Sequence, residues 1–122
     1  MLTGSCHCGA VRFAIEAPIT ELTTCDCSLC TRRGAQMTAV PETALTILAG
    51  ADMLSRYRWN SGVAEHCFCS RCGIYVFHRK RMMPDHFGIN VGCLQGFDPA
   101  GIPVRATAGT GLSLSPENPA AG

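Results

Sequence analysis

The amino-acid sequence predicts a mostly β fold, built from small antiparallel sheets in a single domain. Short apolar segments with strand-like alternation are separated by turn residues, and no long helical pattern interrupts them. The chain has 122 residues, a length typical of one domain with one core. Only 7% of the residues are aromatic, so the core is thin and we expect further cross-links, either disulfides or metal ions.

The expected strands are short and end at turn residues. In the first of them Val11, Phe13 and Ile15 alternate with polar or small residues, and Pro18 follows. We expect strands at 10–15, 21–25, 36–40, 45–48, 55–59, 64–69, 74–78 and 87–94. One helical turn is predicted at 28–33, with Ser28 as its N-cap and Gly34 as its end. The predicted zinc-binding β domain covers 1–105, and 106–122 is expected to be a loosely structured tail.

The charge pattern argues against several classes of partner. Charged residues make up 16% of the chain and the formal net charge is +1, which is too weak to indicate a nucleic-acid partner. The basic run at 79–81 is short, and we interpret it as solvated surface. No apolar segment approaches the ~18–20 residues of a membrane span. The segment before Cys6 is too polar and short for a signal peptide, so we expect a cytoplasmic protein. In the reducing cytoplasm, clustered cysteines more often bind metal than form disulfides.

Four of the nine cysteines fit a closed zinc site. Cys69 and Cys72 form a Cys-x-x-Cys-Gly knuckle, in which a tight turn directs both sulfur atoms to one point. Cys6 and Cys8 are two residues apart and would point to the same side of an extended strand. Together they predict a structural zinc site with four protein ligands, and zinc binding there contributes to the free energy of folding.

Three further thiols lie within six residues and predict a different kind of site. Cys25, Cys27 and Cys30 lack a fourth cysteine or histidine nearby in sequence, and three ligands with an open position are typical of catalytic zinc. Alternatively, a distant residue such as Cys93 or His86 completes a second structural site. Arg32 and Arg33 follow directly and could offset the thiolates or hold a substrate carboxylate, or could be surface residues only.

Spacing alone leaves one ambiguity, because 67–72 has the same C-x-C-x-x-C spacing as 25–30. Gly73 favours the knuckle for Cys69 and Cys72, which leaves Cys67 unassigned. We interpret Cys67 and Cys93 as small buried apolar residues. The four histidines are scattered, and His86, beside a Met-Pro-Asp turn, is the one we expect to line a site.

The three cysteine clusters resemble a known family. The stretches at 4–13, 25–30 and 68–73 are similar to the glutathione-dependent formaldehyde-activating enzymes, and 48–94 more closely resembles the centromere protein V branch of that family. The resemblance covers about residues 3–98. It implies a mostly β fold around two zinc ions, one structural on Cys6, Cys8, Cys69 and Cys72, and one catalytic on Cys25, Cys27 and Cys30.

The same resemblance implies an activity. The family condenses glutathione with formaldehyde to S-hydroxymethylglutathione, and it is classed with the carbon–sulfur lyases. We therefore expect a zinc-dependent enzyme that acts on a thiol–aldehyde adduct, with a small-molecule thiol such as glutathione as partner. The alternatives are a non-enzymatic zinc-binding structural or interaction module and, less favoured, an iron–sulfur protein.

Overall fold

The computed structural model of the chain describes residues 1–25, 27–58, 64–80 and 83–107. It has ten β-strands, one α-helix and three short 3-10 helices in this part of the chain. The strands are β1 Leu2–Ser5, β2 Arg12–Ile15, β3 Leu22–Cys25, β4 Met37–Pro41, β5 Leu45–Ala49, β6 Leu54–Tyr57, β7 Glu65–Cys69, β8 Tyr75–Arg79, β9 His86–Asn90 and β10 Val104–Thr107. The helix is α1 Ser28–Arg33, and the 3-10 helices are Glu42–Ala44, Ala51–Met53 and Val91–Cys93. The prediction of a mostly β single domain is confirmed.

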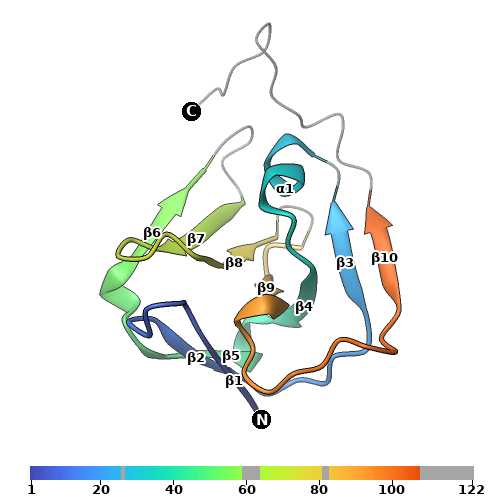
Figure 1. Ribbon diagram of the computed structural model, residues 1–122, viewed down its shortest axis with the longest axis horizontal. Coiled ribbons are helices and arrows are strands. Elements are labelled where there is room, and N and C mark those ends of the chain that lie inside the picture. Colours follow the sequence, from blue (N-terminus) through green and yellow to red (C-terminus); the bar gives the residue numbers. More distant parts are fainter. Residues whose placement is uncertain (26, 59–63, 81–82, 108–122) are drawn as a thin grey trace, which may run out of the picture.

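Two sheets share the core. A three-stranded sheet has the order β1-β2-β5, and a seven-stranded sheet has the order β10-β3-β4-β9-β8-β7-β6. In Figure 1 the small sheet lies near the N-terminus, and the large sheet curves around the molecule so that β6 and β10 lie on opposite sides. The fully buried side chains that fill the space between them include Val11, Phe13, Ile15, Leu22, Val40, Val76 and Ile89. The alternation predicted for Val11, Phe13 and Ile15 therefore does place these residues in the core.

One strand pair departs from the antiparallel expectation. β10 pairs with β3 in parallel, with Val104 opposite Leu22 and Thr107 opposite Cys25. β3 in turn is joined to β4 only through the pair Thr23 and Met37. β10 ends at Thr107, so it extends two residues into the segment predicted to be a tail; the remainder of that segment lies outside the described residues.

Three local predictions differ from the structure in detail. The strand expected at 87–94 ends at Asn90, where the Asn90 side chain accepts a hydrogen bond from Gly92 N and begins a 3-10 helix. β1 was not predicted, because Leu2–Ser5 is short and carries little apolar alternation. The strand expected at 55–59 is β6 Leu54–Tyr57, which begins one residue earlier, and position 59 lies outside the described residues.

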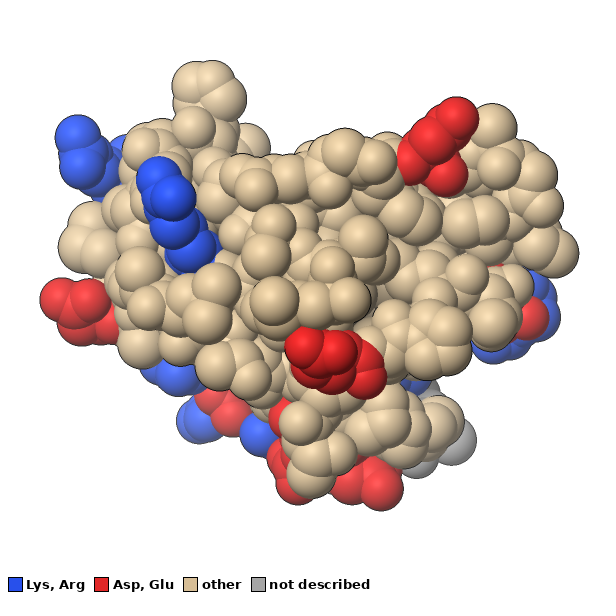
Figure 2. All heavy atoms as spheres, turned by 90° about the horizontal axis from the view of Figure 1, so that it is seen from below, with Lys and Arg blue, Asp and Glu red and all other residues tan. Residues whose placement is uncertain are grey.

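The surface carries few charges. The face shown in Figure 2 is mostly uncharged, with acidic and basic side chains interspersed on it. Of the predicted basic run at 79–81, Arg79 forms an ion pair with Glu42 at 2.8 Å, whereas position 81 lies outside the described residues. In the described part of the chain, no helix is long and apolar enough to cross a membrane.

Candidate functional site

The structure brings together the four thiols of the predicted structural site. The Sγ atoms of Cys6, Cys8, Cys69 and Cys72 all lie within 4.8 Å of one another, and we call them the four-thiol group. Two matching turns present them. The backbone N–H of Cys6 donates to Val11 O at 3.1 Å, and that of Cys69 donates to Ile74 O at 2.9 Å.

Glycines make both turns possible. Gly9 and Gly73 follow the cysteine pairs and have φ angles of 80° and 79°, a region that side-chain-bearing residues rarely adopt. Gly73 N donates to Cys69 O at 2.8 Å and closes the knuckle. The predicted role of Gly73 in a knuckle is thereby explained by its backbone conformation.

The donor set fits a tetrahedral zinc ion. The Sγ atoms of Cys6 and Cys8 are 3.6 Å apart, and those of Cys8 and Cys69 are 3.8 Å apart. Zinc–sulfur bonds of about 2.3 Å in a tetrahedron require sulfur–sulfur distances of about 3.8 Å. Backbone hydrogen bonds from Cys8 and Ile74 also lower the pKa of Cys72 to about 6, which favours the thiolate that a metal needs.

The second group, Cys25, Cys27 and Cys30, also has all its Sγ atoms within 4.8 Å, and we call it the three-thiol group. Cys25 ends β3, Cys27 precedes α1 and Cys30 lies in the first turn of that helix. Among the described residues, no fourth histidine, cysteine or carboxylate belongs to this group. Cys93 and His86, which could have completed a second structural site, lie elsewhere.

The N-cap of α1 corrects one prediction. Ser28 was expected to cap the helix, but Cys27 is the N-cap, and its Sγ accepts a hydrogen bond from Cys30 N at 3.3 Å. Cys27 N in turn donates to Cys25 Sγ at 3.4 Å. Burial raises the pKa of Cys27, but hydrogen bonds to its sulfur from the Cys30 backbone and from the Cys30 and Cys25 side chains outweigh burial and lower the pKa overall. Backbone N–H donors on sulfur suit thiolates, so this group also fits a metal ion. Gly34, with φ 63°, ends the helix as predicted.

The three-thiol group opens onto a pocket of about 190 Å³ between α1, the β3–β10 pair and the β7–β8 hairpin. Its other polar lining comes mostly from basic, histidine, tyrosine and threonine side chains, and no carboxylate is among the described residues that line it. The principal lining residues besides the three thiols are Arg33, His66, Tyr75, His78, Lys80 and Arg105.

Four of these side chains form a closed set of contacts, which we call the Arg33 network: Arg33, His66, His78 and Tyr75. Arg33 Nη1 donates to His66 Nδ1 at 3.0 Å, and its guanidinium carbon lies 3.6 Å from the centroid of the Tyr75 ring. The rings of His66 and His78 stack at 5.3 Å, and His78 Nδ1 hydrogen-bonds the Tyr75 hydroxyl. The network therefore joins the helix that carries Cys30 to the β7–β8 hairpin.

The titratable members of the network stay neutral near pH 7. Burial, with the Arg33 charge, lowers the pKa of His66 to about 4. Burial, with the charges of His66, Lys80 and Arg33, lowers the pKa of His78 to about 3. Burial also raises the pKa of Tyr75 well above its usual value. Both imidazoles and the phenol can therefore act as neutral hydrogen-bonding groups in the pocket.

The expectation that His86 lines a site was wrong. Its Nδ1 pairs with Asp85 Oδ1 at 3.0 Å, outside both cysteine groups and the pocket. His66 and His78 were missed because they are twelve residues apart in sequence. They face each other directly across the β7–β8 pair, so aligning the two predicted strands about the knuckle would have placed them together.

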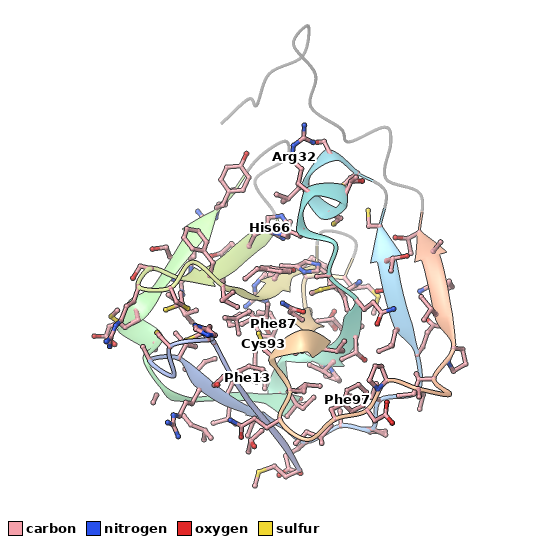
Figure 3. The ribbon with its side chains drawn as sticks, in the orientation of Figure 1. Phe13, Arg32, His66, Phe87, Cys93 and Phe97 are labelled. Carbon is pink, nitrogen blue, oxygen red and sulfur yellow. The ribbon has the colours of Figure 1, made fainter. Side chains whose placement is uncertain are left out.

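Arg32 and Arg33 have different roles, although they are neighbours. Arg32 is exposed and donates back to Ser28 O at 2.8 Å in its own helix, and Figure 3 shows it directed away from the molecule. Arg33 turns inward to His66, which lies on the inner side of α1 in the same view. Arg32 is therefore a surface residue, and of the two arginines only Arg33 is placed to act in the site.

The two unassigned cysteines belong to neither group. Cys67 is buried on the opposite face of the β7–β8 hairpin from His66, where it lines a second pocket with Leu54, Phe77 and Phe87. Cys93 is 8% exposed, and its thiol donates to Tyr75 O at 3.5 Å. Of the two triplets with equal spacing, only 25–30 comes together as three thiols, because Cys69 and Cys72 join Cys6 and Cys8.

The fold and these two groups define a class: small mostly β proteins with paired cysteine clusters that could hold metal ions. The sequence profile of the glutathione-dependent formaldehyde-activating enzymes matches residues 1–106. The chain belongs to this family, as its motifs predicted.

Two relatives illustrate the membership. A Halomonas elongata protein, provisionally named a glutathione-dependent formaldehyde-activating enzyme, is 33% identical over 88 residues. The alignment covers 63% of this chain and 56% of that protein, so the match spans little more than half of the relative. The crystal structure of a Rhodobacter sphaeroides protein is 37% identical and superimposes with a TM-score of 0.78, covering 84% of this chain and 99% of the other.

Proposed function

We propose that this protein is a zinc-dependent enzyme of the carbon–sulfur lyase type, acting on the adduct of a small thiol and an aldehyde. Glutathione with formaldehyde, or a related pair, is the proposed substrate. The observation that carries the proposal is the three-thiol group, which opens onto a pocket instead of being closed by a fourth described ligand. Family membership supports the choice of thiol and aldehyde.

The two cysteine groups have different proposed tasks. Cys6, Cys8, Cys69 and Cys72 would hold a structural zinc ion with all four positions filled by protein. Cys25, Cys27 and Cys30 would hold a catalytic zinc ion with one position left for substrate. When bound there, zinc would lower the pKa of a substrate thiol and favour its thiolate.

The charge of the pocket suits an anionic thiol. Arg33, Lys80 and Arg105 contribute positive side chains, whereas the described lining contains no carboxylate. Glutathione carries two carboxylates, and guanidinium groups bind carboxylates through paired hydrogen bonds. Arg105 already pairs with Glu21 at 2.9 Å, whereas Arg33 contacts the neutral side chains of His66 and Tyr75, so among the described residues its charge is not offset by a carboxylate.

The proposed reaction forms the carbon–sulfur and O–H bonds and breaks the S–H bond and the carbonyl π bond. A lone pair on the thiol sulfur attacks the aldehyde carbon and forms the carbon–sulfur bond. The π pair of the carbonyl group moves to oxygen, and that oxygen takes up a proton equivalent to the one lost by the thiol. The chain's own contribution is to bind the thiol beside the pocket and to supply neutral donors from the Arg33 network.

A reducing, cytoplasmic setting remains our prediction, because thiolate ligands and a free thiol substrate both require it. The non-enzymatic alternative would use the same zinc ions only to stabilise the fold. It gives no role to a pocket lined by three thiols, two neutral histidines and several cations.

Catalysis can be tested by exchange NMR with ¹³C-formaldehyde and glutathione, which measures how fast the free aldehyde and the S-hydroxymethyl adduct interconvert. We expect the wild-type protein to accelerate the exchange and Cys27→Ser to lose the acceleration while remaining folded. The enzymatic proposal would be contradicted if the exchange rate were the same with wild-type protein, with Cys27→Ser and without protein. A spectral response of the cobalt-substituted protein to glutathione would separate binding from catalysis.

A further inference from the structure

Tyr75 occupies a place in the pocket that the proposed function does not yet use. It begins β8, three residues after Cys72, and its backbone is held by two neighbours. Asn90 Nδ2 donates to Tyr75 O at 2.9 Å, and the Cys93 thiol donates to the same oxygen at 3.5 Å. The aromatic ring then extends into the pocket, where Cys30 is near enough for its charge to influence the phenol.

The ring of His78 is fixed from both sides. On one side it stacks on His66 of β7 with an interplanar angle of 25°. On the other side it lies against Gly88 of the neighbouring strand β9. A Cβ atom at Gly88 would be only 2.4 Å from His78 Cε1 and 2.9 Å from Nδ1. Because packing on the two flanking strands sets the imidazole plane, Nδ1 is held toward the Tyr75 hydroxyl.

The network also determines which atoms can donate protons. A guanidinium group has no acceptor, so His66 Nδ1 must accept from Arg33, and a neutral His66 carries its proton on Nε2. If His78 carries its single proton on Nδ1, it donates to the Tyr75 oxygen and leaves the phenol's own proton free. Arg33, 3.6 Å above the phenol ring, favours negative charge that develops on the phenol as its proton is shared.

We propose that the Tyr75 hydroxyl donates the hydrogen bond that stabilises the aldehyde oxygen while the carbon–sulfur bond forms, and that His78 orients this hydroxyl. The inference rests on the proposed function. As sulfur bonds to carbon and the carbonyl π pair moves to oxygen, charge develops at the atom that Tyr75 contacts. A preoriented neutral donor stabilises that charge without reorganisation. Tyr75 is the catalytic residue in this account, and His78 is a positioning residue.

The hydrogen-bond direction can be measured without turnover. In ¹⁵N-labelled, zinc-loaded protein, the chemical shifts of the two imidazole nitrogens distinguish the tautomers of His78. We expect the Nδ1–H tautomer. An Nε2–H tautomer would mean that the Tyr75 hydroxyl is itself the donor to His78, and this result would overturn the assignment of Tyr75.

The catalytic role is tested by Tyr75→Phe, with Tyr57→Phe as a matched control because Tyr57 is exposed on β6 and does not line the pocket. Loss of one such donor typically lowers kcat by about 10²-fold. We expect that loss for Tyr75→Phe, with unchanged zinc content and unchanged glutathione affinity by calorimetry. The rate of Tyr57→Phe should stay within twofold of wild type.

His78→Phe keeps a flat ring between His66 and Gly88 but removes Nδ1, and His86→Phe outside the pocket is its control. We expect a lower kcat with unchanged KM for glutathione in His78→Phe only. If wild type is active and Tyr75→Phe retains its kcat, this inference fails while the proposed function stands. If wild type itself shows no rate acceleration, both fail together.

Discussion

The four-thiol and three-thiol groups differ chiefly in how far apart their ligands lie in the chain. In the first, Cys8 and Cys69 are 61 residues apart, so closing the group joins the N-terminal segment to the β7–β8 knuckle. In the second, all three thiols lie between Cys25 and Cys30, so a metal ion there would cross-link almost nothing. A metal ion on the four-thiol group would therefore stabilise the fold, whereas one on the three-thiol group would keep a position open for chemistry.

The largest effect should follow from Cys69→Ser. Cys69 is fully buried and its thiol lies 3.8 Å from that of Cys8. Structural zinc contributes on the order of 10 kcal/mol to folding, which is comparable with the total stability of a small domain. We expect the variant to be unfolded by circular dichroism at 25 °C. A cooperative thermal transition within a few degrees of wild type would contradict the structural role of this group.

Cys27→Ser should change activity far more than stability. A serine at this position can still cap α1, because its hydroxyl can accept the hydrogen bond from Cys30 N that the thiol accepts now. We expect the variant to stay folded, with a melting temperature lowered by only a few degrees, but to lose one zinc ion and more than about 10²-fold in activity. If both serine variants unfold alike, the two groups do not divide the tasks.

Acid should lower the stability of the folded protein through His66, which lines the pocket. Its pKa is about 4 in the folded protein and about 6.5 when unfolded, so between these values the unfolded chain binds more protons and stability rises with pH. Lowering the pH from 7 to 5 should therefore cost about 2 kcal/mol through His66. Between pH 7 and 5, the free energy of unfolding measured in urea should fall by about 2 kcal/mol less for His66→Gln than for wild type. Equal losses would show that His66 is not buried in its neutral form.

The smallest effect separates the two neighbouring arginines. Arg33→Gln removes the contacts with His66 and Tyr75, and we expect KM for glutathione to rise about tenfold, or about 1.4 kcal/mol of binding free energy. Arg32→Gln is the matched control and should leave KM within twofold, because Arg32 bonds only to its own helix among the described residues. Similar KM values in both variants would remove Arg33 from substrate binding.

The cysteine groups could be predicted from sequence because their geometry is local. A two-residue spacing on extended chain and a Cys-x-x-Cys-Gly turn each fix the relative positions of two sulfur atoms within a few residues. Spacing alone could not show whether 25–30 or 67–72 forms the separate triplet of thiols. That choice required the fold, which places Cys69 and Cys72 beside Cys6 and Cys8 and leaves Cys67 on the other face of β7.

The pocket residues were harder to predict, because they come from elements distant in sequence. His66 and His78 meet through strand register, and the shift between Cys67 and Phe68 brings Tyr75 to the same side. β10 reaches the pocket through a parallel pairing with β3, which no local pattern indicates. Ser28 has the better helix-capping propensity, yet Cys27 caps α1, so the sulfur cluster overrides the local preference.

The most direct test of the division between the two groups is the zinc content of the purified protein, measured by mass spectrometry of metals against protein concentration. We predict two zinc ions per chain, of which a chelator removes the first together with activity and the second only with unfolding. One zinc ion per chain or none would contradict this prediction, as would simultaneous loss of both ions, activity and fold.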